Sequence, residues 1–135
     1  MKKKTIIILI AAFLVLLCAG GFFFLLPSPK LNADDINQIQ FASYPAPPMK
    51  KILTEKEDIQ KFVSAFNELH LTPRLAIAHA TGTSVFIKVS GKQTLNISMM
   101  GSTVDINAMS YRCSVDASAK FRELYQTYAL PEEKY

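Results

Sequence analysis

The side chains of this 135-residue chain that are best suited to catalysis or metal binding are two cysteines and two histidines. His70 and His79 could bind a metal ion as neutral imidazoles, and Cys113 could act as a nucleophile beside a histidine. The histidines have no third ligand at a usable spacing, however. Cys113 lies in a segment typical of a strand and shares one face with Tyr111 and Val115, as small core cysteines usually do. We therefore expect no metal, no cofactor and no catalytic residue.

Signatures of other enzymes and of nucleic-acid-binding proteins are absent from the sequence. There is no G-x-S-x-G motif and no glycine-rich loop of the kind that binds phosphate. The formal net charge is +4, but three of the fifteen basic residues form the run at 2–4, so the rest is close to neutral. No later basic run exceeds residues 50–51, which argues against nucleic-acid binding. Cys18 and Cys113 cannot readily meet, which excludes a disulfide scaffold.

An uncharged apolar run at residues 5–26 predicts a membrane anchor. A helix of this length spans about 33 Å, which matches the hydrocarbon core of a bilayer. The lysines at 2–4 stay cytoplasmic under the positive-inside rule, and Pro27 and Pro29 end the helix. We therefore expect a single-pass protein of the cell membrane. Residues 1–29 form the lysine run and the transmembrane anchor, and residues 30–135 form one domain outside the cytoplasm.

Two other fates of the N-terminal segment remain open. The small residues at 19–21 resemble a signal-peptidase site, although cleavage there would leave an apolar new N-terminus at residues 22–26. Cys18 could carry a lipid, but Leu17 occupies the preceding position, where a small residue is expected. Both alternatives, like the uncleaved anchor, place the domain outside the cytoplasm.

Two amphipathic helices are predicted in the domain. The first covers residues 55–69, with Thr54 as its N-cap and Glu57 completing a capping box, and Pro73 prevents its continuation. The second covers residues 117–128 and is capped by Asp116. Apolar side chains follow the helical period in each, at Ile59, Phe62, Val63, Phe66 and Leu69 and at Phe121, Leu124, Tyr125 and Tyr128.

Strand patterns fill most of the remaining domain. Alternating apolar and polar residues at 84–90 and 94–100 predict a hairpin that turns at Gly91 and Lys92. Shorter or weaker strands are expected at residues 36–44, 49–53, 103–106 and 110–114, whereas residues 75–80 fit a strand or a connector. The short links between strands favour an α+β fold, in which two helices cover one face of a small antiparallel sheet.

Tyrosine and proline side chains are the one concentration of interface-prone residues in the domain. From them we predict a possible interaction surface made of Tyr44, Pro45, Pro47, Pro48, Tyr111, Tyr125 and Tyr128. Tyr125 and Tyr128 also fit the core-facing stripe of the second helix, so both roles stay open for them.

Three short segments carry a strand, a capped helix and a turn: LNADDINQI at 31–39, TEKEDIQK at 54–61 and INAMSY at 106–111. In this layout the chain resembles a family of small exported or membrane-anchored proteins of unknown function from low-GC Gram-positive bacteria. The family pattern has a helix of the form T-x-K-E-x-I-Q-K and a hairpin of the form I-N-x-x-x-Y. Ala108 departs from it, because a turn glycine is expected there. The resemblance implies an envelope location and no particular activity.

These features favour a non-enzymatic binding or modulator domain at the cell envelope. Its partner would be an envelope protein or a wall component, and residues 5–26 would contact the membrane. The anchor would keep even a weak binder at high local concentration. Two alternatives remain open. One is a small extracytoplasmic enzyme that uses Cys113 or His79, and the other is an accessory subunit of a membrane complex that packs through the small residues at 18–21.

Overall fold

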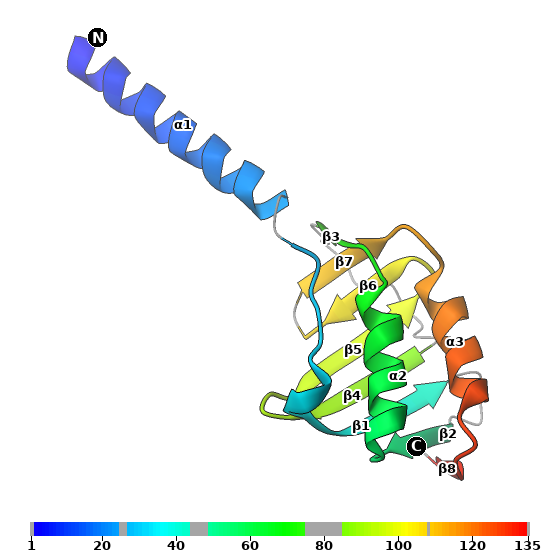
Figure 1. Ribbon diagram of the computed structural model, residues 1–135. Coiled ribbons are helices and arrows are strands. Elements are labelled where there is room, and N and C mark those ends of the chain that lie inside the picture. The colour runs from blue at the N-terminus through cyan, green and yellow to red at the C-terminus, as the bar shows by residue number, and fades with distance from the viewer. Residues whose placement is uncertain (1, 25–26, 44–48, 75–84, 108, 135) are drawn as a thin grey trace.

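A long N-terminal helix projects from a sheet that is covered by two further helices in the described part of the chain (Figure 1). The computed structural model describes residues 2–24, 27–43, 49–74, 85–107 and 109–134. In chain order the elements are α1 (Lys3–Phe24), the 3-10 turn η1 (Ala33–Asp35), β1 (Ile36–Ser43), β2 (Met49–Leu53), α2 (Lys56–Asn67), β3 (Leu71–Arg74), β4 (Val85–Gly91), β5 (Leu95–Met100), β6 (Thr103–Ile106), β7 (Met109–Cys113), α3 (Ala117–Thr127) and β8 (Glu133–Lys134).

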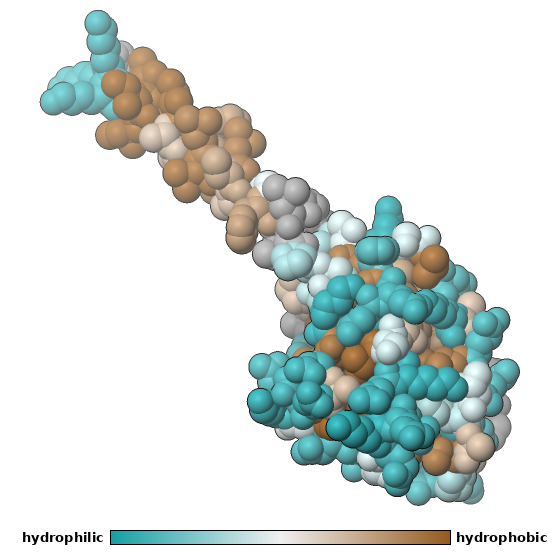
Figure 2. Space-filling view, in the orientation of Figure 1, coloured by the Kyte–Doolittle hydropathy of each residue, from teal (hydrophilic) through white to brown (hydrophobic). Residues whose placement is uncertain are grey.

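Helix α1 exposes its apolar side chains. The span Lys3–Phe22 has a mean hydropathy of 2.7 and none of it is buried, so α1 is long and apolar enough to cross a membrane. Figure 2 shows this apolar surface continuing along the helix, next to a domain surface that is largely hydrophilic. A soluble monomer rarely exposes so large an apolar surface, which needs lipid or another apolar partner to cover it.

The domain contains one antiparallel sheet with the strand order β3-β7-β6-β5-β4-β1-β2-β8. Helices α2 and α3 pack on the same face of it. The ring centroid of Phe41 in β1 lies 5.5 Å from that of Phe62 in α2 and 6.2 Å from that of Phe121 in α3. These rings form the centre of the core between the two layers, and the predicted α+β fold is confirmed.

Helix α2 has the predicted apolar stripe but begins later than predicted. Its buried residues are Ile59, Phe62, Val63 and Phe66. The first helical residue is Lys56, Glu55 holds the N-cap position, and no side chain caps the helix, so the predicted Thr54 capping box is wrong. The physical reason is spacing. Strand β2 ends at the buried Leu53, which leaves Thr54 in the connection, one position too early to reach the free amides.

Helix α3 begins as predicted, with Asp116 as its N-cap. Oδ1 of Asp116 accepts a hydrogen bond from the Ala119 amide at 3.0 Å, which is the main reason that the pKa of this carboxyl lies below its ordinary value. The other end of α3 is held by the buried Lys51 of β2. Its Nζ donates to the carbonyl oxygens of Tyr125 at 2.9 Å and Tyr128 at 2.8 Å. A cation at this position also interacts favourably with the helix dipole.

Most predicted strands are present. Strands β2 and β6 have the predicted bounds, and β1, β4, β5 and β7 differ by one residue at one or both ends. Strands β3 and β8 are absent from the prediction. Pro73 lies in β3, which is an edge strand among the described strands, where a missing amide is tolerated. The predicted strand or connector at 75–80 lies outside the described residues.

Candidate functional site

The segment between α1 and the sheet is bound to the domain through Ser28. The Ser28 hydroxyl donates to the Leu69 carbonyl oxygen at 3.1 Å and accepts a hydrogen bond from the Leu71 amide at 2.9 Å. Both partners are backbone groups, Leu69 in the connection after α2 and Leu71 at the start of β3. A single side chain therefore satisfies two polar groups of the domain that would otherwise need water.

A second attachment is made by Asn67, the last residue of α2. Its Oδ1 accepts from the Leu31 amide at 2.8 Å, and its Nδ2 donates to the Leu31 carbonyl at 3.0 Å. The amide side chain thus pairs with Leu31 as a neighbouring strand would. Lys30 adds a hydrogen bond from Nζ to the Asn67 carbonyl. We call these contacts of Ser28, Lys30 and Leu31 with residues 67–71 the clamp.

A third attachment lies at η1, where the backbone meets the β4–β5 hairpin. The Asp35 carbonyl accepts from the Lys92 amide at 3.0 Å. Gly91 permits this approach, because a Cβ built at that position would lie only 1.9 Å from the Asp35 oxygen. The segment from Ser28 to Asp35 is therefore part of the domain fold and not a free tether.

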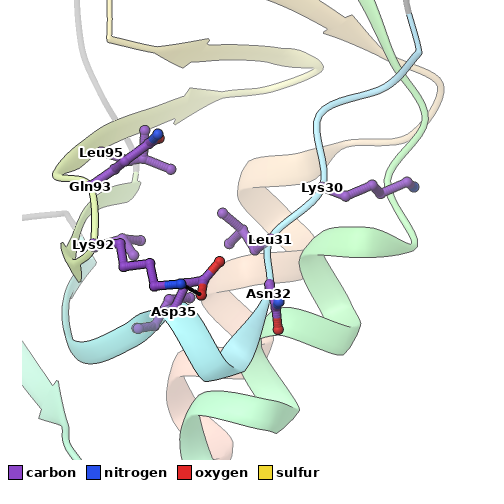
Figure 3. A pocket seen from close by; sticks show the side chains of 9 residues that line it. Lys30, Leu31, Asn32, Asp35, Lys92, Gln93 and Leu95 are labelled. Carbon is purple, nitrogen blue, oxygen red and sulfur yellow. Dashed lines mark ion pairs between the residues drawn. The ribbon is translucent and has the colours of Figure 1, made fainter.

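A shallow pocket of about 200 Å³ lies between this segment and the β4–β5 hairpin (Figure 3). Leu31 points into it from one side and Leu95 lines the other. Lys92 and Asp35 form an ion pair of 3.1 Å at its edge, with side chains 78% and 43% exposed. Typical small-molecule sites hold roughly 300–1,000 Å³. The pocket is therefore smaller than a typical small-molecule site.

The residues with catalytic potential are not assembled into a site by the described part of the structure. Cys113 is 4% exposed and faces the core, where it lies opposite Leu71. His70 is exposed just after α2, and His79 lies outside the described residues. Among the residues that are described, no group of three histidine, cysteine, aspartate or glutamate side chains is arranged to hold a metal ion.

The residues of the predicted interaction surface lie in different environments. Tyr44, Pro45, Pro47 and Pro48 lie outside the described residues. Tyr111 in β7 is half-buried against the core. Tyr125 and Tyr128 are core residues, 6% and 3% exposed, so their rings offer little area to a partner.

Burial also determines the ionisation of these two tyrosines. It is the main cause that raises the pKa of Tyr125 to about 12, and the negative charge of Glu132 acts in the same direction. The pKa of Tyr128 is raised as well, chiefly by burial and further by Asp58. Both phenols are therefore neutral at physiological pH and serve the packing of α3.

Sequence reasoning missed the clamp residues Ser28 and Asn67. Asn67 lies 36 residues from Leu31 along the chain, so no local pattern reveals the pairing. A polar residue at the end of an amphipathic helix is usually interpreted as a side chain that contacts only solvent. The one available signal is that Ser28 and Asn67 are small polar residues, which hydrogen-bond readily to the backbone.

No family model, curated protein or solved structure matches this chain. Its function must therefore be inferred from its own geometry. The features that bear on it are the exposed apolar helix α1, the clamp and the small pocket beside η1.

Proposed function

We propose that this chain is a single-pass membrane protein whose α+β domain lies outside the cytoplasm and binds a protein or a wall component of the cell envelope. The main support for the proposal is the short connection between the anchor and the domain. Helix α1 is apolar and unburied, and four residues after its end Ser28 is already hydrogen-bonded into the domain fold. So short a connection limits how far the domain can lie from the membrane surface.

The topology follows from charge. Residues 2–4 are lysines directly before the apolar span. Basic residues next to a membrane helix are retained in the cytoplasm, so the domain on the other side of the span is extracytoplasmic. The resemblance to small exported proteins of low-GC Gram-positive bacteria agrees with this orientation.

A binding role is favoured over an enzymatic one by what the polar side chains do. Asp116 and Lys51 complete the two ends of α3, Asn67 and Ser28 hold the juxtamembrane segment, and Cys113 is buried. Each of these groups has a structural task. Membrane attachment compensates for a weak binding surface, because it raises the local concentration of the domain and its partner.

The proposal is tested by site-specific photocrosslinking in living cells. A photoreactive residue replaces Gln93 at the edge of the pocket, and another replaces the exposed Gln60 of α2 as a matched control away from it. We expect one dominant adduct from position 93 that is weak or absent from position 60. Crosslinks that are equally diffuse at both positions would contradict a specific binding role.

The same strains separate this proposal from the accessory-subunit alternative. If α1 is exchanged for an unrelated membrane helix, a domain that binds its partner directly keeps its adduct. Loss of the adduct in the exchanged chain, with the protein still in the membrane fraction, would instead indicate recognition through the anchor.

A further inference from the structure

The clamp gives the domain a defined membrane-proximal end. Ser28 lies four residues beyond Phe24, the last residue of α1. A fully extended chain covers at most about 14 Å over that distance. Because Ser28 binds Leu69 and Leu71, the start of β3 is confined to this distance from the end of α1. Figure 1 shows the β3–β7 end of the sheet toward α1 and the C-terminus at the far end.

Two arginines lie at this end of the sheet. Arg74 in β3 is opposite Ser110 of β7, and Thr72 is opposite Arg112, so the arginines are diagonal neighbours on one sheet face. The Nη1 of Arg74 donates to Oγ1 of Thr103, the residue that pairs with Arg112 from the other side. Both arginines are exposed. Within the described part of the chain, neither guanidinium forms an ion pair. We call Arg74 and Arg112 the arginine pair.

The carboxylates near the arginine pair either bind another group of the domain or are less exposed than the arginines. Glu68 forms an ion pair of 3.1 Å with Lys120, and Asp116 caps α3. Asp105 lies opposite Ser110 and is therefore a diagonal neighbour of Arg112 on the same face, but it is mostly buried. The acidic first turn of α2, with Glu57 and Asp58, lies at the opposite end of that helix. Lys56 lies in the same turn, so this end, which we call the far end of the domain, carries charges of both signs.

We propose that the arginine pair binds the phosphate groups of anionic lipids in the leaflet from which the domain emerges. This inference rests on the proposed membrane anchoring. Guanidinium groups pair with phosphate oxygens through two parallel hydrogen bonds, which makes arginine well suited to this ligand. The clamp keeps both arginines near the bilayer surface, whereas Glu57 and Asp58 lie at the far end of the domain. Lipid contact thereby fixes the tilt of the domain and the direction in which its pocket opens.

The experiment uses the full-length chain in lipid nanodiscs of phosphatidylcholine alone or of phosphatidylcholine mixed with phosphatidylglycerol. Cys18 and Cys113 are replaced by alanine, and a single fluorophore is attached through Ser114→Cys, beside the arginine pair. A second protein carries it through Glu57→Cys at the far end. Lipids with a spin-labelled headgroup quench the fluorophore whenever it contacts the surface. Co-elution of protein and discs shows separately whether the chain is anchored.

Quenching at position 114 measures the fraction of molecules whose labelled end contacts the membrane. We expect the ratio of contacting to free molecules to rise about tenfold when phosphatidylglycerol is present. High salt or the double variant R74Q/R112Q should abolish this increase, whereas R74K/R112K should retain part of it. The matched control K56Q/K134Q, at the far end, should leave the increase unchanged. No such increase is expected when the label is at position 57.

Equal quenching at position 114 in both lipid compositions, in a chain that co-elutes with the discs, would overturn the lipid-binding inference and leave the anchoring intact. The same holds if R74Q/R112Q behaves like the parent protein while its circular dichroism spectrum shows it folded. A chain that elutes apart from the discs would instead overturn the anchoring on which the inference depends.

Discussion

Replacing Asn67 by alanine removes both side-chain hydrogen bonds to Leu31 and leaves the rest of the clamp in place. Each such bond contributes about 0.5–1.5 kcal/mol, and the freed backbone groups of Leu31 are partly buried. Alanine recovers a few tenths of a kcal/mol through its helix propensity. We therefore expect the N67A variant to lose about 2 kcal/mol. For a domain of this size that lowers Tm by roughly 8 °C.

Two assays measure this effect in full-length protein held in detergent or nanodiscs. Thermal unfolding followed by circular dichroism gives the change in Tm. Trypsin cleavage after Lys30, whose Nζ is bonded to the Asn67 carbonyl, reports opening of the segment. A loss of about 2 kcal/mol should raise the cleavage rate tenfold or more, because each 1.4 kcal/mol corresponds to a factor of ten.

The matched control is Q60A, an exposed residue of the same helix for which the described structure gives no side-chain hydrogen bond. Its Tm and cleavage rate should equal those of the parent protein. If N67A behaves like Q60A in both assays, the segment is not held by Asn67 and the reasoning fails.

Three further outcomes are expected. The G91A variant should unfold at a markedly lower temperature in thermal melts, because its Cβ would lie 1.9 Å from the Asp35 oxygen and the two backbones must separate. In urea titrations D116A should lose about 1 kcal/mol at neutral pH with the N-cap. Because folding lowers the pKa of Asp116 below 3.8, its contribution is present above that pH and declines as the pH falls further, so parent and variant should converge in acid. The thiol of Cys113 should react with a thiol reagent only after denaturation, since it is 4% exposed.

Elements with a strong local pattern could be predicted from the sequence. Alternation placed β4 and β5 within a residue, and the stripe of apolar residues identified α2 and α3. The prediction of Asp116 as the N-cap was correct because the helical pattern starts directly after it. The Thr54 cap failed because one extra linker residue, Glu55, separates it from the helix. Helix boundaries depend on such single positions more than on the periodic pattern.

Features that depend on distant residues could not be predicted. The arginine pair forms only because β3 and β7 are neighbours, and Arg74 and Arg112 lie far apart in a sequence with no basic cluster near either. The turn between β6 and β7, by contrast, depends on neighbouring residues. Asn107 has a left-handed backbone, with φ of 52°, and position 108, where a glycine was expected, lies outside the described residues. Asparagine tolerates this conformation better than most residues.

The orientation of the domain is the central claim, and cysteine labelling in intact cells tests it most directly. Cys18 and Cys113 are replaced by alanine, and single cysteines are introduced at the exposed Ser114 or at Lys3 before the apolar span. With a membrane-impermeant maleimide, Ser114→Cys should be labelled in intact cells and Lys3→Cys only after permeabilisation, both in the membrane fraction at full-length mass. The reverse pattern, or a labelled domain released from the membrane, would contradict the account.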